Sequence, residues 1–288
     1  MMFMTVVDLK NYIGNLISID DALDPLQSGR YKLAELYRKA LEAVRNNNHH
    51  IDSHYRDFTE FLGRLIDICI LLEAPKELKQ KLNMLLARLK EPIGKNKKTA
   101  KKLLNDKTFT EFVDEIKRLI KRIVERSASQ LGSLDPLERD RINAAIHCYF
   151  EGLPYASAAM AIVAIEYRLM RLMAGAKPEE EEELKELTLG QLIRRYLENL
   201  KRYVIDSKPI IPHEHKSVLL WINDVRVFSV HPKHVKIDLH IARDVLSRAL
   251  HFLLATAETL KAIELRAIRR ELSEEEHYKE SPISSLNT

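Results

Sequence analysis

Apolar residues recur every three or four positions along most of the chain, which is the spacing of one face of an α-helix. In the N-terminal part this spacing predicts helices over 28–45 and 55–72. A further helix is expected to begin at Pro75, and another to follow a loop at 91–102 that contains proline and glycine. The N-terminal part is therefore predicted to be helical.

The C-terminal part has the same periodicity in shorter stretches separated by turn residues. Asp135 can cap a helix, Pro136 suits the first helical position, and Glu138 can bond back to the cap. Thr188 is a second candidate cap. The expected helices cover 141–151, 155–173, 188–203, 213–230 and 238–272. This part is therefore predicted to be a bundle of helices.

The composition agrees with an all-α class. The 288 residues include only eight glycines and ten prolines, and the chain is rich in the residues that favour helices. Small polar residues at 127–133 mark the candidate boundary between two parts. We therefore expect a basic helical region at 1–127, a four- or five-helix bundle at 133–272 and a polar tail at 273–288.

Positive charge is concentrated in the N-terminal region. Residues 1–127 hold 24 Lys and Arg against 18 Asp and Glu, whereas the rest of the chain holds 22 against 24. The densest group consists of Lys95, Lys97, Lys98, Lys101 and Lys102. Such a group can neutralise RNA phosphates, and a solvated loop and helix face is the alternative. RNA or the ribosome is therefore a candidate partner.

Cysteine usage and hydropathy favour a cytoplasmic protein. Cys69 and Cys148 lie far apart within apolar patterns, as buried thiols do in a reducing compartment. The first residues do not form a secretory leader, and no apolar run approaches the ~20 residues that span a bilayer. We therefore expect no membrane partner.

Motifs that bind nucleotides, cofactors or metals are missing from the sequence. It contains no glycine-rich phosphate loop, no serine-nucleophile elbow and no Cys-x-x-Cys pair. Several histidines cluster, but without a nearby cysteine or the helix-face spacing of a metalloprotease: His213, His215, His231, His234 and His240. We therefore expect neither a cofactor nor a metal.

The stretch VRVFSVHPKH places Arg226 and His231 five positions apart. Pro232 disfavours helical geometry at the residue before it, so a helix should end here and leave His231 free to approach Arg226. Histidine can act as base or acid, and arginine can grip a phosphate, which are the needs of metal-independent RNA cleavage. The alternative is structural: Arg226 pairs with Glu166 of a neighbouring helix, and His231 caps the helix end.

Three features, in this order, resemble the HEPN superfamily, in particular a branch catalogued as a domain of unknown function. They are the run NAAIHCYFEGLPYASAAMAIVAIEYRLMRLM, then LTLGQLI, then VRVFSVHP. The resemblance covers 133–265 and makes Glu166 the glutamate of the Ala-rich helix. It also makes 188–190 the Thr-Leu-Gly helix start, and Arg226 and His231 the motif pair.

This resemblance implies a homodimer in which two Arg226–His231 pairs form one site. It implies a metal-independent endoribonuclease that leaves 2′,3′-cyclic phosphate ends, of a defence or toxin type, with a protein antitoxin as a candidate partner. Active members usually carry a polar residue directly after the arginine, whereas Val227 stands there. A second hypothesis therefore stays open: a catalytically inactive HEPN-fold dimeric adaptor, or a regulatory factor associated with RNA or the ribosome.

Overall fold

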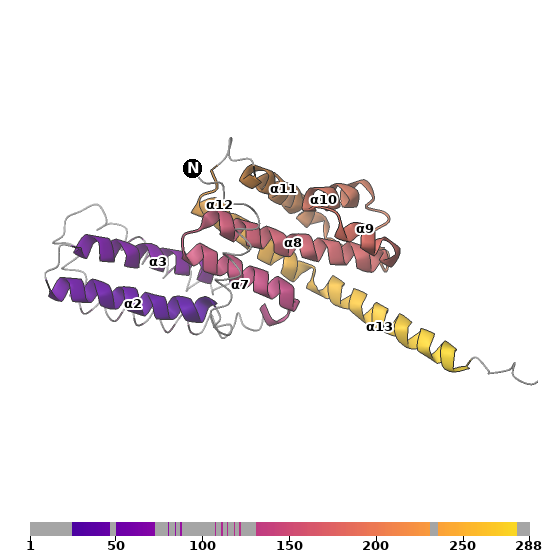
Figure 1. The fold of residues 1–288 in the computed structure, drawn as a ribbon, viewed down its shortest axis with the longest axis horizontal. Coiled ribbons are helices and arrows are strands. Elements are labelled where there is room, and N and C mark those ends of the chain that lie inside the picture. The colour runs from indigo at the N-terminus through magenta and orange to yellow at the C-terminus, as the bar shows by residue number, and fades with distance from the viewer. Residues whose placement is uncertain are drawn as a thin grey trace, which may run out of the picture. The chain divides into compact units, whose positions relative to one another are not determined.

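The computed structural model describes residues 25–46, 50–72, 131–230 and 236–280, together with isolated positions between 80 and 121. Within these residues every regular element is a helix except one short hairpin, which confirms the all-α class (Figure 1). None of the helices in these ranges is long and apolar enough to cross a membrane.

The N-terminal elements are α2 (Pro25–Arg45) and α3 (Ile51–Leu71), followed by α7 (Pro136–Phe150) and α8 (Pro154–Ala176). Then come η2 (Pro178–Glu180), α9 (Glu181–Lys185), α10 (Leu189–Glu198), β1 (Val204–Ile205) and β2 (Lys208–Pro209). The last elements are η3 (His213–His215), α11 (Lys216–Val230), α12 (Leu239–Ala255) and α13 (Ala257–Glu280).

The chain divides into two compact units, each assembled from separated stretches of sequence. Unit 1 consists of Met1–Gly132, Asp140–Met160 and Ile237–Leu246. Unit 2 consists of Ser133–Arg139, Ala161–Lys236 and Ser247–Thr288. The linear division into 1–127, 133–272 and 273–288 stays a prediction.

In unit 1, α2 and α3 pack side by side around aromatic residues (Figure 1). The rings of Tyr37 and Phe58 lie 5.5 Å apart, and those of Phe61 and Phe150 5.8 Å apart. The expected thiols Cys69 and Cys148 are free and buried. Burial raises the pKa of Cys69 to about 12, which keeps this thiol protonated.

The starts of α7 and α10 follow the capping signals in the sequence. At α7 the Leu137 N–H donates to Asp135 Oδ1 (2.9 Å), and the Asp135 N–H donates to Glu138 Oε2 (3.3 Å). At α10 the Thr188 N–H donates to Gln191 Oε1 (2.9 Å), which completes a capping box. Both predicted caps are confirmed.

The predicted helix over 188–203 is wrong at its C-terminal end, because α10 ends at Glu198. The Asn199 side chain donates to the carbonyl of Arg195 (3.0 Å), and such bonds compete with the helical ladder. The chain then forms the β1–β2 hairpin, which the sequence pattern did not predict. Asp206 and Ser207 at its tip have φ of 49° and 63°, as in a tight hairpin turn.

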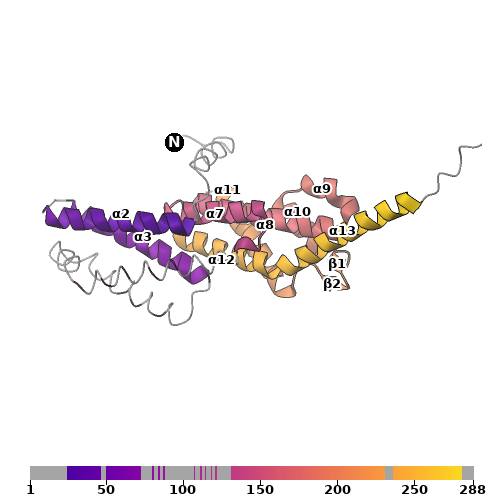
Figure 2. The ribbon, with the colours of Figure 1, turned by 90° about the horizontal axis from the view of Figure 1, so that it is seen from below.

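The single helix predicted over 238–272 is also wrong, because α12 and α13 are separate helices that meet at Thr256. The Thr256 hydroxyl donates to the carbonyl of Phe252 (2.7 Å), and Nη1 of Arg168 donates to the carbonyl of Leu253 (2.7 Å). A guanidinium that binds a carbonyl in the last turn favours a helix end there. Helix α13 continues to Glu280 and runs past the other helices of unit 2, with the hairpin beside it (Figure 2).

Candidate functional site

Arg226 lies half-buried on α11 within unit 2, close to the first turn of α10. A Cβ on Gly190 would approach Nη2 of Arg226 to 3.2 Å and Oδ1 of Asn223 to 3.0 Å. Gly190 therefore lets α10 approach α11 closely, and the space that a side chain would fill belongs to the Arg226 guanidinium. This close approach gives a physical reason for the glycine of the Thr-Leu-Gly helix start.

Glu166 of α8 connects these two helices. Its Oε1 accepts the N–H of Leu189 at the start of α10 (2.5 Å), and its charge interacts with that of Arg226. Burial raises the pKa of Glu166, whereas the Leu189 N–H and Arg226 lower it in part. The charges of Glu166 and Arg226 interact across the helices, whereas a direct pairing of the two side chains stays a prediction.

The solvent face of α11 is partly apolar beside this cluster. Leu220 is 49% exposed and Val227 is 40% exposed, and their separation of seven residues puts both on one face of the helix. Val227, which directly follows Arg226, is thus a surface residue. Its side chain is available for contact with a partner.

The other predicted site residues fall outside the described part of the chain. These are His231, which follows the last residue of α11, and Lys95, Lys97, Lys98, Lys101 and Lys102. Three cations nearby in sequence are described, and Lys107, Arg118 and Lys121 are all exposed. The pairing of Arg226 with His231 and the basic RNA contact stay predictions.

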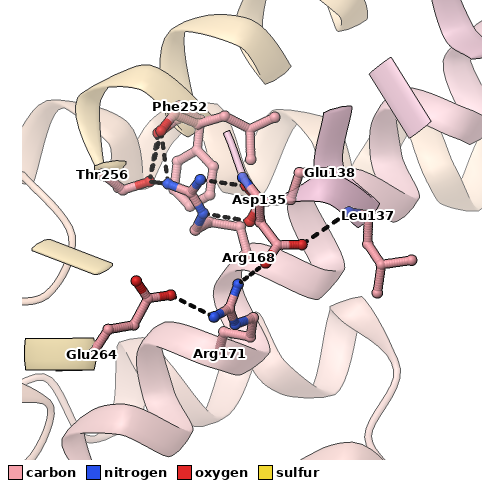
Figure 3. Close-up of polar contacts among 9 residues, drawn as sticks. Asp135, Leu137, Glu138, Arg168, Arg171, Phe252, Thr256 and Glu264 are labelled. Carbon is pink, nitrogen blue, oxygen red and sulfur yellow. Dashed lines mark hydrogen bonds and ion pairs between the residues drawn. The ribbon is translucent and has the colours of Figure 1, made fainter. Parts of the chain in front are cut away.

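A buried ion pair that the sequence pattern did not indicate lies elsewhere in unit 2. Arg168 and Glu138 are almost completely buried, and Nε of Arg168 donates to Oε1 of Glu138 (2.5 Å) while Nη2 donates to Oε2 (Figure 3). Nη1 of Arg168 also donates to Thr256 Oγ1 (2.9 Å). The guanidinium therefore joins the starts and ends of three helices: α7, α12 and α13.

A sequence signal for this pair does exist. Arg168 occupies a position of the apolar stripe of α8, three residues after Ile165 and four before Leu172, both of which are fully buried. A charge within such a stripe requires a buried partner, because an unpaired charge in a core is costly. Glu138, read from the sequence as a capping residue, is that partner.

Arg171, one turn further along α8, is bound by two carboxylates. Its Nη1 donates to Asp135 Oδ2 (2.7 Å) and its Nη2 to Glu264 Oε1 (2.6 Å), as Figure 3 shows. Arg171 and Glu264 also line a hollow of about 440 Å³ within unit 2. The walls of this hollow come from the C-terminal end of α8, η2, α9, β1 and α13.

The arrangement has three chemical capabilities. The Arg226 cluster offers a positioned cation for an anionic group, the Arg168–Glu138 pair is sealed from solvent, and the hollow can accommodate a small ligand. In the described ranges, no three His, Cys, Asp or Glu side chains group in a way that would hold a metal ion. No protein-family model matches the chain, and neither a curated protein nor a solved structure matches it.

Proposed function

We propose that the protein acts on RNA as a HEPN-like, metal-independent endoribonuclease in which Arg226 and His231 form the reacting pair. The observation that carries the proposal is the three-helix cluster of Glu166, Gly190 and Arg226. Gly190 leaves room for the Arg226 guanidinium near the end of α11, the charge of Glu166 interacts with that of Arg226, and the neighbouring Val227 is exposed. A cation held in place before the substrate binds stabilises developing charge without reorganising.

The proposed reaction needs no bound group. His231 of one subunit takes the proton of a ribose 2′-hydroxyl, and the 2′-oxygen attacks phosphorus. The bond from phosphorus to the 5′-oxygen breaks, and His231 of the partner subunit protonates that oxygen. Arg226 binds the phosphate oxygens as charge develops on them. The products are a 2′,3′-cyclic phosphate and a 5′-hydroxyl.

Cleavage of single-stranded RNA in EDTA tests this proposal. We expect wild type to cut, Arg226→Ala and His231→Ala to lose activity, and the products to carry 2′,3′-cyclic ends by mass spectrometry. Arg226→Lys is the matched control, because it keeps the charge without the planar fork and should retain only a small part of the activity. Each variant must keep the wild-type oligomeric state by light scattering. A wild type without activity in EDTA would overturn the proposal.

A second candidate function is a non-catalytic dimeric adaptor. It is favoured by the apolar face of α11, where Leu220 and Val227 are both exposed. Exposed apolar side chains that share a face are typical of protein contact surfaces. In this case the charge interaction between Glu166 and Arg226 stabilises the bundle, and Arg226 does not bind substrate.

RNA binding at low salt separates the two candidates. An adaptor associated with RNA would bind without cutting, and its affinity would fall when Lys97, Lys98, Lys101 and Lys102 are changed to glutamine. Wild type that neither cuts nor binds RNA would exclude both RNA functions and leave an adaptor between proteins. A candidate protein antitoxin would then be tested against the Leu220 and Val227 face.

A further inference from the structure

The hollow in unit 2 has an aliphatic floor. Residues of two helices and the hairpin form it: Met170, Ala174, Gly175, Ile205, Leu260 and Ile263. Ala174, Ile205, Leu260 and Ile263 each keep 6–8% of their surface accessible, as expected where a hollow reaches into a core. A volume of about 440 Å³ lies within the range of small-molecule sites in proteins.

Small residues keep this floor open. A Cβ on Gly175 would lie 2.1 Å from Cγ2 of Ile263, so the Ile263 side chain of α13 packs directly on the backbone of α8 here. Ala174 and Ala176 flank this contact, and Ala267 lines the wall one turn beyond Ile263. The packing of α8 against α13 therefore forms most of the floor of the hollow, and η2, α9 and β1 complete its walls.

The rim of the hollow is mainly cationic. Arg171, Lys185, Arg266 and Arg270 line it, against the carboxylates of Glu181 and Glu264. Arg266 and Arg270 are one turn apart on α13, so both guanidinium groups can reach one anionic group. The apolar end of the α13 wall is Leu260 and Ile263, and the basic end is Arg266 and Arg270.

Two of the rim cations have exposed carboxylate partners that a ligand can displace. Arg266 pairs with Asp206 at the tip of the hairpin, and Lys185 pairs with Glu181 at 2.8 Å. These side chains are 40–72% exposed. Exposed ion pairs contribute only about 0–1 kcal/mol, so an anion seated in the hollow can take over these cations.

The floor distinguishes between possible ligands. One aromatic residue lines the hollow, Tyr167, and the Arg171 guanidinium already covers its ring at 5.5 Å. A nucleobase would therefore find no free aromatic face, whereas an alkyl chain fits walls of Leu, Ile, Ala and Met side chains. We propose that this hollow binds a single-chain aliphatic anion, with the chain along Leu260 and Ile263 and the carboxylate or phosphate head at Arg266 and Arg270.

Titration calorimetry with dodecanoate, below its micelle-forming concentration, tests the proposal on the full chain. We expect saturable binding with one site per chain, and no comparable binding of dodecyltrimethylammonium, which has the same chain and the opposite charge. Equal binding of both detergents, or no binding of dodecanoate, would overturn the proposal. Binding of adenosine monophosphate in place of dodecanoate would also overturn it and would identify a nucleotide site.

Two adjacent arginines provide a matched pair of variants. Arg269 and Arg270 are both exposed on α13, but only Arg270 lines the hollow. We expect Arg270→Glu to weaken dodecanoate binding about tenfold or more, because a charge-assisted contact is replaced by repulsion, and Arg269→Glu to change it little. Equal losses in the two variants would point to non-specific attraction and overturn the assignment of the head group.

A substitution that adds bulk to the wall of the hollow tests where the alkyl chain of the ligand lies. Ala267 is exposed and lines the hollow, whereas Ile268 is exposed on another face of the same helix. Ala267→Phe should abolish binding by filling the hollow, and Ile268→Phe should not. Co-sedimentation with anionic phospholipid vesicles distinguishes the source: sedimentation that depends on Arg270 indicates a membrane lipid, and its absence indicates a free anion. Unchanged binding by Ala267→Phe would exclude this hollow.

Discussion

At the scale of single residues, the core of unit 2 contains a buried charged side chain among its apolar residues. Arg168 is the largest of the fully buried side chains in the described core, and its guanidinium bonds to Glu138, Thr256 and the carbonyl of Leu253. Each nitrogen of the guanidinium therefore has a hydrogen-bond acceptor within the protein. The core accommodates this buried ion pair only while Arg168 and Glu138 are both present.

Arg168→Met should lower the free energy of unfolding by about 3–5 kcal/mol, because it leaves Glu138 buried without its counter-charge. The double variant with Glu138→Leu should recover most of this loss. Urea denaturation followed by circular dichroism measures both effects. Arg202→Met is the control, since Arg202 is exposed and Glu180 keeps Arg195 as a second partner, so this change should alter stability by less than about 1 kcal/mol. A double variant no more stable than Arg168→Met would contradict the argument.

The raised pKa of Glu166 predicts a pH dependence with a definite sign. Burial favours the protonated carboxyl in the folded state, so its contribution to stability is complete below the usual pKa of 4.5. It is lost as pH rises through the higher pKa of the folded protein. The difference in unfolding free energy between wild type and Glu166→Gln should therefore fall as pH rises from below 4.5 towards neutrality. A difference that rises with pH would show that Arg226 outweighs burial.

At the scale of elements, local signals predict helix starts better than helix ends. The caps at Asp135 and Thr188 depend on residues within one turn, so the sequence alone identifies them. The break at Thr256 depends on Arg168, which is 88 residues away, and no local pattern marks it. The same limit applies to the site: the sequence indicated Glu166 and Arg226, but only the fold shows that Gly190 makes room for the guanidinium.

The contact between α8 and α13 offers a test of packing. Gly175→Ala places a methyl group 2.1 Å from Cγ2 of Ile263, so it should lower the unfolding midpoint in spite of the better helix propensity of alanine. The expected cost is about 1–3 kcal/mol. Gly132→Ala is the control, because nothing lies within 4 Å of its Cβ position. Adding Ile263→Ala to Gly175→Ala should cost less than Ile263→Ala costs in wild type; additive effects would argue against a direct clash.

At the scale of the whole molecule, the proposed dimer should depend on the exposed face of α11. Leu220→Asp combined with Val227→Asp should shift the protein to monomer in light scattering, since burying two carboxylates at an interface is unfavourable. Leu265→Asp combined with Leu272→Asp is the matched control, because these residues are 50% and 56% exposed on α13. Dissociation by the control pair alone would move the interface to α13.

Unit 1 is assembled from three separated stretches of the chain, which has a consequence for its synthesis on the ribosome. Asp67 Oδ2 accepts a hydrogen bond from the Tyr149 hydroxyl (2.9 Å), and Asp67 Oδ1 lies 3.8 Å from Nη1 of Arg243. The Ile237 N–H donates to the Tyr155 hydroxyl. Translation at about 5–20 residues per second separates Asp67 from Arg243 by on the order of ten seconds or more. The contacts that Asp67 and Tyr155 make with the last stretch of unit 1 therefore form late in synthesis. A nascent chain paused before residue 237 would lack this stretch and would expose apolar surface of unit 1 to chaperones.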